Sequence, residues 1–277
     1  MSLNVVILAA GKGTRMHSNL PKVLQPLAKK SLIEHVLDTS KSLKPSAITV
    51  VTGYKSDLIK SAILDDSILW RLQDEQLGTG HAVKQAIPDL NNDKTLILYG
   101  DVPLIKKLDL QELVRKADSG LALMTFVKEN PQGYGRILRN KNKIIAIVEE
   151  KDSTDEQKKI TEINTGIMAV KTTNLISWLG KLTNNNSQKE FYLTDIVKFA
   201  VEDGVSISSH DAKNELSIIG VNSKKELAFI ERGFQMNKAE ALLKEGVTLM
   251  DPNRIDIRGE VKCGKDVTID VGCIFEG

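Results

Sequence analysis

The stretch Val5-Val6-Ile7-Leu8-Ala9-Ala10-Gly11-Lys12-Gly13-Thr14-Arg15-Met16 decides the fold of this 277-residue chain. Its first four residues form a continuous apolar run, which predicts a strand inside a parallel sheet covered on both faces. The strand runs directly into a glycine loop, where missing side chains let backbone N–H groups approach an anion closely. The stretch therefore predicts an α/β protein whose first strand ends at an anion-binding loop.

Farther along the chain, short β-rich runs alternate with helical patterns, which is typical of βαβ units and a mostly parallel sheet. Ser31 and Glu34 form a capping-box pattern at the start of the first expected helix. The expected strands are 48–52, 95–99, 121–127 and 164–170, with a hairpin of 135–137 and 144–148, and the expected helices are 32–37, 56–64, 192–201 and 224–245. We predict a doubly wound, mostly parallel sheet with an antiparallel insertion near residues 130–170.

Composition argues against two classes of partner. The formal net charge is only +2, so no global field attracts nucleic acid or an anionic membrane. Aromatic residues make up 4% of the chain, too few for base-stacking platforms. The apolar run 5–10 is too short for a signal peptide or a membrane span, and the two cysteines, Cys263 and Cys273, lie near the end of the chain. We expect a cytoplasmic protein that neither binds nucleic acid nor inserts into a membrane.

The last part of the chain carries a six-residue repeat. Two interleaved series follow it: Ile255, Val261, Val267 and Cys273, and Ile257, Cys263, Ile269 and Phe275. Such a period predicts a parallel β-helix, in which one coil takes about 18 residues. The alternative is a pair of ordinary hairpin strands that close the main sheet. We expect a domain over 1–224, a linker helix over 225–250 and the start of a left-handed β-helix over 251–277.

Two cations accompany the glycine loop: Arg15 within it and Lys22 after Pro21. The loop is not a dinucleotide fingerprint, because Met16 stands where the third glycine belongs, and its spacing does not fit a Walker A loop. Phosphate binding is therefore expected. The alternative is a plain strand-to-helix turn with both cations in solvent.

Two further loops follow predicted strands. Asp101 comes after Tyr99-Gly100, and a carboxylate beside an anion loop suits Mg²⁺, which takes its remaining ligands from phosphates and water. Gln73 precedes Gly78-Thr79-Gly80-His81, and its amide matches the edge of a pyrimidine ring. Taken singly, each loop is also compatible with an ordinary turn.

Together these motifs resemble those of sugar-1-phosphate nucleotidyltransferases. Other stretches narrow the resemblance to the uridylyltransferase half of the bacterial bifunctional N-acetylglucosamine-1-phosphate uridylyltransferase/glucosamine-1-phosphate acetyltransferases. These stretches are Gly133-Tyr134-Gly135-Arg136, Ile147-Val148-Glu149, Glu162-Ile163-Asn164-Thr165-Gly166, Leu182-Thr183-Asn184-Asn185-Asn186, Tyr192-Leu193-Thr194-Asp195 and Gly220-Val221-Asn222. The resemblance covers nearly the whole chain, including the start of the six-residue repeat.

The resemblance implies a nucleotide-diphospho-sugar transferase fold and a site for each substrate. Catalytic roles fall to Arg15, Lys22 and Asp101. Nucleotide binding falls to Leu8, Ala9, Ala10, Gly11, Lys22, Gln73, Gly78, Thr79, Tyr99, Gly100 and Asp101. Sugar binding falls to Gly135, Glu149, Asn164, Tyr192, Thr194 and Asn222, and Mg²⁺ binding to Asp101 and Asn222.

The implied reaction joins UTP and N-acetylglucosamine 1-phosphate into UDP-N-acetylglucosamine and pyrophosphate, for bacterial cell-wall and lipopolysaccharide precursors. Full-length family members are homotrimers whose contacts lie largely in the β-helix, so the resemblance leaves the state of this chain open, and acetyl transfer is not expected of it. Two alternatives stay open: a nucleotidyltransferase for another base or sugar, and a non-catalytic regulatory module of the same fold.

Overall fold

The computed structural model describes residues 2–277 and is built around a nine-stranded sheet. Across this sheet the strands run in the order β11 (Ser206–Asp211), β7 (Gly120–Val127), β10 (Glu162–Lys171), β6 (Lys94–Tyr99), β1 (Leu3–Ala9), β4 (Ala47–Thr52) and β5 (Ile68–Leu72). β1 pairs in parallel with β4 and β6, whereas β10 is antiparallel to β6 and β7. The hairpin of β8 (Gly135–Asn140) and β9 (Lys143–Val148) joins β10. The prediction of a mostly parallel sheet with an antiparallel insertion is confirmed.

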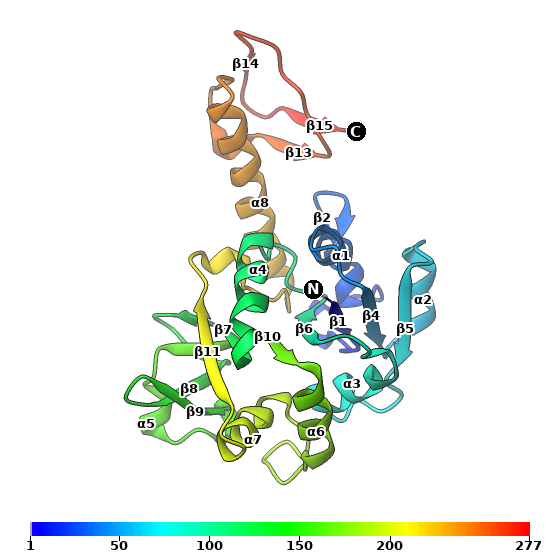
Figure 1. Ribbon diagram of the computed structural model, residues 1–277. Helices are drawn as coiled ribbons and strands as arrows, with labels where there is room; N and C mark the ends of the chain where they lie inside the picture. The colour runs from blue at the N-terminus through cyan, green and yellow to red at the C-terminus, as the bar shows by residue number, and fades with distance from the viewer. Residues whose placement is uncertain (1) are drawn as a thin grey trace.

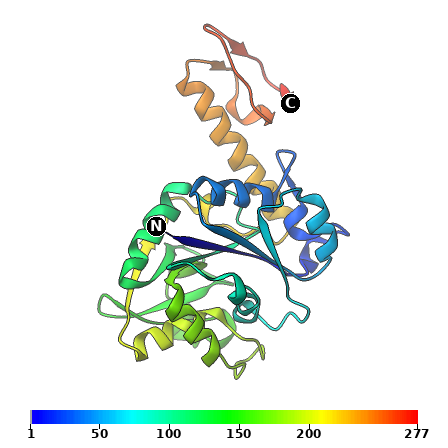
Figure 2. The same ribbon diagram turned by 45° about the vertical axis from the view of Figure 1, so that its right-hand side comes forward.

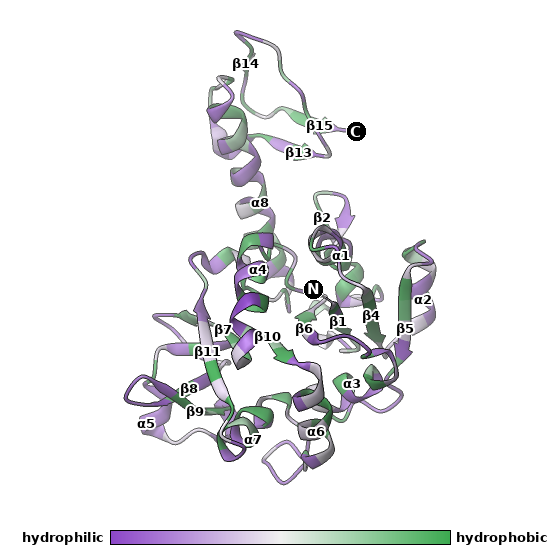
Figure 3. Cartoon of the chain, viewed as in Figure 1, coloured by the Kyte–Doolittle hydropathy of each residue, from purple (hydrophilic) through white to green (hydrophobic). Residues whose placement is uncertain are grey.

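Helices cover both faces of the sheet (Figure 1). One core contains Val5 and Ile7 of β1 with residues of α1 (Leu32–Ser42), α2 (Ser56–Ala62) and α4 (Lys107–Lys116). The other contains Val6 and Leu8 with residues of α3 (Thr79–Gln85), α6 (Thr172–Lys181) and α7 (Ile196–Glu202). Successive β1 side chains thus enter opposite cores, which explains why this strand is apolar without a break. Figure 3 shows the same concentration of hydrophobic residues along β1 and β4.

A local sequence signal explains where α1 begins, whereas α7 begins later than its pattern predicts. The capping box of α1 is present, and the backbone N–H of Ser31 donates to the Glu34 carboxylate at 2.8 Å. The helix expected over 192–201 is shorter: a 3-10 turn, Leu193–Asp195, precedes α7. The Leu193 N–H donates to the Thr79 hydroxyl at 3.1 Å, so a tertiary contact holds the start of this segment outside the helix.

A long helix carries the last part of the chain away from the sheet. α8 (Lys224–Lys244) projects from the body, and the four tail strands lie at its far end (Figures 1 and 2). β12 (Thr248–Leu249) pairs in parallel with β14 (Thr268–Ile269), and β13 (Asp256–Arg258) with β15 (Ile274–Glu276). The alternative of hairpin strands closing the main sheet is wrong, because these pairs are parallel and separate from it.

The tail is fixed to α8 by apolar and polar contacts. Ala239 and Leu242 share a small core with Ile255, Ile257 and Ile269. The buried Gln235 amide accepts from the Ile257 N–H at 2.7 Å and donates to its carbonyl at 3.2 Å, as a neighbouring strand would. Residues of the six-residue repeat therefore form the core of the tail.

Smaller elements complete the chain. They are β2 (Pro26–Leu27), β3 (Lys30–Ser31), α5 (Asp155–Lys158) and the 3-10 helices Thr14–Met16, Lys22–Leu24, Ile87–Asp89, Ala117–Ser119, Glu150–Asp152, Glu215–Ser217 and Pro252–Arg254. From Ser2 to Gly277, none of the helices has both the length and the apolar character that a bilayer span requires.

Candidate functional site

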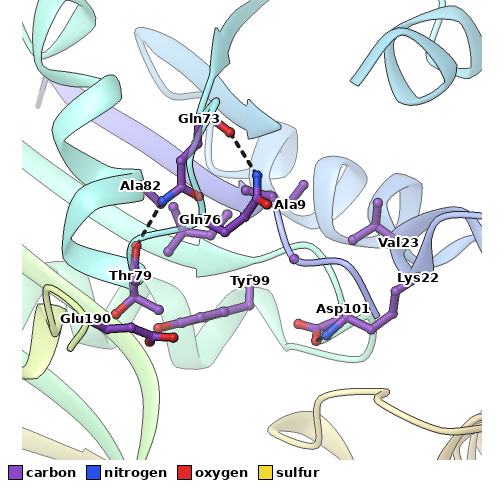
Figure 4. A pocket seen from close by; sticks show the side chains of 14 residues that line it. Ala9, Lys22, Val23, Gln73, Gln76, Thr79, Ala82, Tyr99, Asp101 and Glu190 are labelled. Carbon is purple, nitrogen blue, oxygen red and sulfur yellow. Dashed lines mark hydrogen bonds and ion pairs between the residues drawn. The ribbon is translucent and has the colours of Figure 1, made fainter. Parts of the chain in front are cut away.

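Two adjoining cavities open at the carboxyl ends of β1 and β6. The first, about 260 Å³, is lined by Leu8, Ala9, Ala10, Gly11, Lys22, Val23, Gln73, Gln76, Gly78, Thr79, Ala82, Tyr99, Asp101 and Glu190 (Figure 4). The second, about 360 Å³, is lined by Arg15, Lys22, Tyr99, Asp101, Val102, Gln132, Gly133, Tyr134, Thr165, Ile218, Gly220, Asn222 and Glu226. Lys22, Tyr99 and Asp101 border both, so the two cavities meet at one charged boundary.

The glycine loop brings Lys22 to this boundary. Gly13 has a left-handed backbone, with φ of 61°, and a Cβ there would lie 2.7 Å from Cβ of Lys22. A side chain at position 13 would therefore displace the segment that carries the lysine. At Gly11 a Cβ would meet nothing within 4 Å, because that position faces the open first cavity.

Lys22, Asp101 and Asn222 form one cluster, although they lie far apart in the sequence. The Lys22 ammonium is ion-paired with Oδ2 of Asp101 and donates to Oδ1 of Asn222 at 2.9 Å. The Asn222 amide nitrogen donates to the Gly220 carbonyl at 3.2 Å, which turns the amide oxygen toward the lysine. Two oxygen ligands of the kind that Mg²⁺ prefers thus converge on one positive charge.

Arg15 supplies a second positive charge to the site. It lies on the 3-10 turn Thr14–Met16 and lines the second cavity. Within residues 2–277 its guanidinium has no ion-pair or hydrogen-bond partner, and its side chain is exposed. It is therefore free to bind an anion that enters beside Asp101.

At the other end of the first cavity, Gln73, Gly78 and Thr79 lie together. Nε2 of the buried Gln73 donates to the Gly78 carbonyl at 3.0 Å and lies 3.1 Å from Nδ1 of His81. The amide nitrogen of Gln73 thus points toward Gly78 and His81. The carbonyl oxygen Oε1 of Gln73 has no partner among the described residues, so it can accept a hydrogen bond from a ligand.

Four of the predicted sugar-binding residues form a second polar cluster, which we call the Glu149 cluster: Gly135, Glu149, Asn164 and Thr194. Gly135 pairs with Asn164 between β8 and β10, and a Cβ on Gly135 would lie 3.4 Å from the Glu149 carboxylate. The Thr194 hydroxyl donates to Oε1 of Glu149 at 2.9 Å. Burial raises the pKa of Glu149, the Thr194 hydrogen bond lowers it, and the neighbouring carboxylates of Asp195 and Asp152 raise it further.

The two other predicted sugar-binding residues make different contacts. The Tyr192 hydroxyl donates to Asp152, in the turn that follows Glu149, at 3.2 Å and accepts from Gln188 at 2.9 Å. Asn222 contacts Lys22 at the boundary of the cavities. This position is compatible with the metal-binding role expected of Asn222.

Tyr99 separates the cavities, and Gly166 fixes its ring. Burial raises the pKa of Tyr99, and the Glu149 and Asp101 carboxylates add to the shift. Gly166 has φ of +84°, and a Cβ there would lie 2.6 Å from Cε2 of Tyr99. Only glycine allows the ring to occupy this place.

Gly166→Ala is expected to destabilise the fold by about 1 kcal/mol more than Gly246→Ala. Gly246 is the matched control, since its φ is +91° but a Cβ there would meet nothing within 4 Å. Both variants carry the backbone strain, and only Gly166→Ala displaces Tyr99. Urea unfolding measures the difference, and equal losses would mean that the Tyr99 contact is unimportant.

Glu149→Gln is expected to change how stability depends on pH. Because the pKa of Glu149 is raised in the folded state, the carboxyl's stabilising contribution is complete below its ordinary value of 4.5 and is lost as pH rises through the folded pKa. The glutamine cannot ionise but still accepts from Thr194. Urea unfolding at about pH 4.5 and about pH 7.5 should therefore show the variant gaining stability relative to the original protein at the higher pH. A pH-independent difference would contradict this assignment.

Several lining residues were not among those predicted. Gln76, Val23, Ala82 and Glu190 border the first cavity, and Gln132, Gly133, Tyr134, Thr165, Gly220 and Glu226 border the second. Some of them are direct neighbours of predicted residues in the same motifs, and that adjacency is a usable signal. Glu190 carries no such signal, because only the folding of the loop before α7 brings it to the cavity.

Comparisons with known proteins agree with the motifs. Residues 5–162 match the family model of the MobA-like NTP transferase domain. The Bifunctional protein GlmU of Methylobacillus flagellatus is 52% identical to this chain over 276 residues, and that of Dechloromonas aromatica is 51% identical over 277. Each alignment covers 99% of this chain, which spans 60% and 61% of the length of these relatives. The resemblance inferred from the motifs is confirmed.

A solved structure is similar in fold. It is described as a putative glucose-1-phosphate thymidylyltransferase from Bacillus anthracis in complex with a sucrose. The TM-score is 0.65 at 20% identity, and the match covers 83% of this chain and 94% of the other. At this identity the similarity supports the fold alone.

Proposed function

Since this chain belongs to the MobA-like NTP transferase domain family, we propose that it transfers the uridylyl group of UTP to N-acetylglucosamine 1-phosphate, as the uridylyltransferase part of a GlmU-type protein. The observation that carries the proposal is the meeting of two cavities at Lys22 and Asp101. A nucleotide in the first cavity would present its phosphates at that boundary. A sugar phosphate arriving from the second would meet them there.

Gln73 supports a uracil base. Its free Oε1 accepts a hydrogen bond, and the ring N3–H of uracil is a donor, whereas N3 of cytosine is an acceptor. The Thr79 hydroxyl lies at the same end of the cavity (Figure 4). We assign nucleotide binding to these residues with Gly78, to the backbone of Leu8, Ala9, Ala10 and Gly11, and to Tyr99 and Gly100.

The Lys22 cluster fits Mg²⁺. Asp101 and Asn222 would hold the ion, because their oxygens already converge on the lysine ammonium, a cation in the same place. When bound, the ion would neutralise phosphate charge and offset the repulsion between the two anionic substrates. Two protein ligands suffice, since Mg²⁺ takes the others from phosphates and water.

The reaction is an in-line displacement at phosphorus. An oxygen of the sugar 1-phosphate forms a new bond to the α-phosphorus of UTP while the bond between that phosphorus and the bridging oxygen breaks, and pyrophosphate leaves. The attacking oxygen is already ionised, so no side chain needs to remove a proton. Arg15 and Lys22 hold the phosphates and stabilise the charge that grows on the leaving group.

The Glu149 cluster is assigned to the sugar. A carboxylate accepts from sugar hydroxyls, while the Asn164 amide both donates and accepts. Gly135 leaves space beside Glu149, and Thr194 fixes one carboxylate oxygen. Tyr192 contributes indirectly, by holding the loop before α7 through Asp152 and Gln188.

We assign three parts to the chain: the transferase domain over 1–224, the linker helix over 225–250 and a first β-helix coil over 251–277. The parallel pairing of Asp256 with Ile274 and of Thr248 with Thr268 supports the coil, because repeats in a β-helix stack in parallel. Cys263 and Cys273 are free thiols, which supports a reducing location such as the cytoplasm.

Pyrophosphate release from a panel of substrates tests the function. UTP, dTTP, CTP and ATP are each combined with N-acetylglucosamine 1-phosphate, glucosamine 1-phosphate or glucose 1-phosphate, with and without Mg²⁺. We expect a clear preference for UTP with N-acetylglucosamine 1-phosphate and dependence on the metal. Preference for another pair would overturn the assignments of Gln73 and the Glu149 cluster. No release by folded protein that binds nucleotide would favour a regulatory module.

A further inference from the structure

Residues 191–194, which we call the connecting segment, lie between the base end of the first cavity and the Glu149 cluster. On the base side the segment is held by three hydrogen bonds to residues 77–80. The Phe191 N–H donates to the Leu77 carbonyl at 2.8 Å, the Gly80 N–H donates to the Phe191 carbonyl at 2.8 Å, and the Leu193 N–H donates to the Thr79 hydroxyl at 3.1 Å. The base loop and the segment therefore form one hydrogen-bonded unit.

Close packing leaves this unit little freedom. A Cβ on Gly78 would lie 2.7 Å from the Phe191 carbonyl oxygen, and one on Gly80 would lie 2.4 Å from Cδ1 of Leu182. Leu193 and Thr194 are buried, with exposed fractions of 1% and 7%. A shift of the base loop is thus transmitted to the segment, because buried close-packed groups move together.

The segment's other end enters the sugar site. Thr194 follows Leu193 directly, and its hydroxyl donates to Oε1 of Glu149 at 2.9 Å. The oxygen that Thr194 fixes belongs to the carboxylate assigned to the sugar. Two hydrogen bonds from neighbouring residues therefore link Thr79 to Glu149.

The Thr79 hydroxyl can take part in both sites. A hydroxyl carries one donor hydrogen and two acceptor lone pairs. Accepting from Leu193 leaves the hydrogen free to donate to a base carbonyl in the first cavity. Figure 4 shows the Thr79 side chain beside Glu190, the residue that precedes the segment.

We propose that Thr79 is a positioning residue for the sugar as well as a contact of the base: by holding Leu193, it keeps Thr194 and Glu149 arranged for the sugar. This inference rests on the proposed function.

Calorimetric titrations with UMP and with UDP-N-acetylglucosamine separate the two roles of Thr79. UMP reports the base, ribose and first phosphate, and the ratio of the two dissociation constants reports the gain from the remainder of the product, including its sugar. Thr79→Val keeps the shape of the side chain and removes the acceptor. We expect it to raise the dissociation constant of UDP-N-acetylglucosamine about 5- to 10-fold more than that of UMP. Thr79→Ser, which keeps the hydroxyl, should preserve the ratio.

A double-mutant cycle tests the path through the segment. Thr194→Val should raise the dissociation constant of UDP-N-acetylglucosamine and leave that of UMP unchanged. In the Thr194→Val protein, adding Thr79→Val should raise the dissociation constants of both ligands by the same factor, because the link to Glu149 is already broken. Thr49→Val is the matched control, since the Thr49 hydroxyl also makes a buried hydrogen bond, to Asp89, outside both cavities. It should change neither constant.

Each outcome decides between alternatives. If Thr79→Val alone raises both dissociation constants by the same factor, the positioning role is overturned and Thr79 is a base contact only. If Thr79→Val still costs UDP-N-acetylglucosamine more affinity than UMP in the Thr194→Val protein, the path through Thr194 is overturned. If the original protein binds UDP-N-acetylglucosamine no more tightly than UMP, the proposed function fails first. Should Thr79→Val not fold, Thr79→Ala serves the same comparison.

Discussion

Asp101→Ala is expected to lower Mg²⁺-dependent pyrophosphate release by about 100- to 1,000-fold. Asp101 is the carboxylate at the boundary of the two cavities, and it shares the Lys22 ammonium with Asn222. The substitution removes a proposed metal ligand and leaves Lys22 with only the amide oxygen to bind. Steady-state rates at saturating UTP and sugar phosphate, measured across a range of Mg²⁺ concentrations, give the effect.

Two variants make the Asp101 result interpretable. Asp101→Asn keeps one oxygen in place and should retain more activity at high Mg²⁺ than the alanine variant. Asp66→Ala removes an exposed carboxylate from a distant loop and should have no effect. Retained Mg²⁺-dependent turnover in a folded Asp101→Ala protein would refute the assignment of this residue as a ligand.

Arg15→Ala is expected to reduce kcat by about 100-fold while changing the affinity for UTP by less than about 10-fold. The unpartnered Arg15 guanidinium lines the second cavity, next to the boundary at which the proposed reaction would place the phosphates. An interaction that strengthens in the transition state affects kcat more than ground-state binding. Steady-state kinetics with direct UTP titration separate the two quantities.

Lys12→Ala is the matched control for Arg15. Lys12 belongs to the same glycine loop but lines a neighbouring hollow with Gly13, Thr14, His17, Ser18, Asn19 and Tyr54. If general positive charge were sufficient, both substitutions would cost similar activity. A change confined to the Michaelis constant for UTP in Arg15→Ala would show that this residue binds the ground state and has no special role in the transition state.

Much of the fold is encoded in local patterns. The strand β1 is apolar at every position because its alternate side chains enter two cores, and Ser31 with Glu34 marks the start of α1. The segment before α7 departs from its pattern. There a contact with Thr79, more than one hundred residues earlier, replaces a helical turn, and local spacing carries no information about such a contact.

The candidate site is predictable to a lesser degree. Motifs point to Lys22, Asp101 and Asn222 individually, but their chain separations of 79 and 200 residues hide the fact that they meet at one point. Its motif likewise gives no sign that the Tyr192 hydroxyl contacts Asp152 and Gln188. The direction of a side chain depends on the packing of its neighbours, which motif spacing does not contain.

The amino-acid sequence by itself determined most strands of the main sheet, the glycine loop, the six-residue repeat and the family. Each of these depends on residue type at short spacing, where backbone conformation and alternating burial act directly. Only the tertiary structure decided that two cavities meet at Lys22 and Asp101, that Asn222 turns its oxygen toward them, and that Thr79 connects the base loop to the Glu149 cluster. Those arrangements arise because the sheet brings the ends of β1 and β6 together, and hydrogen bonds between distant loops then fix the side chains around them.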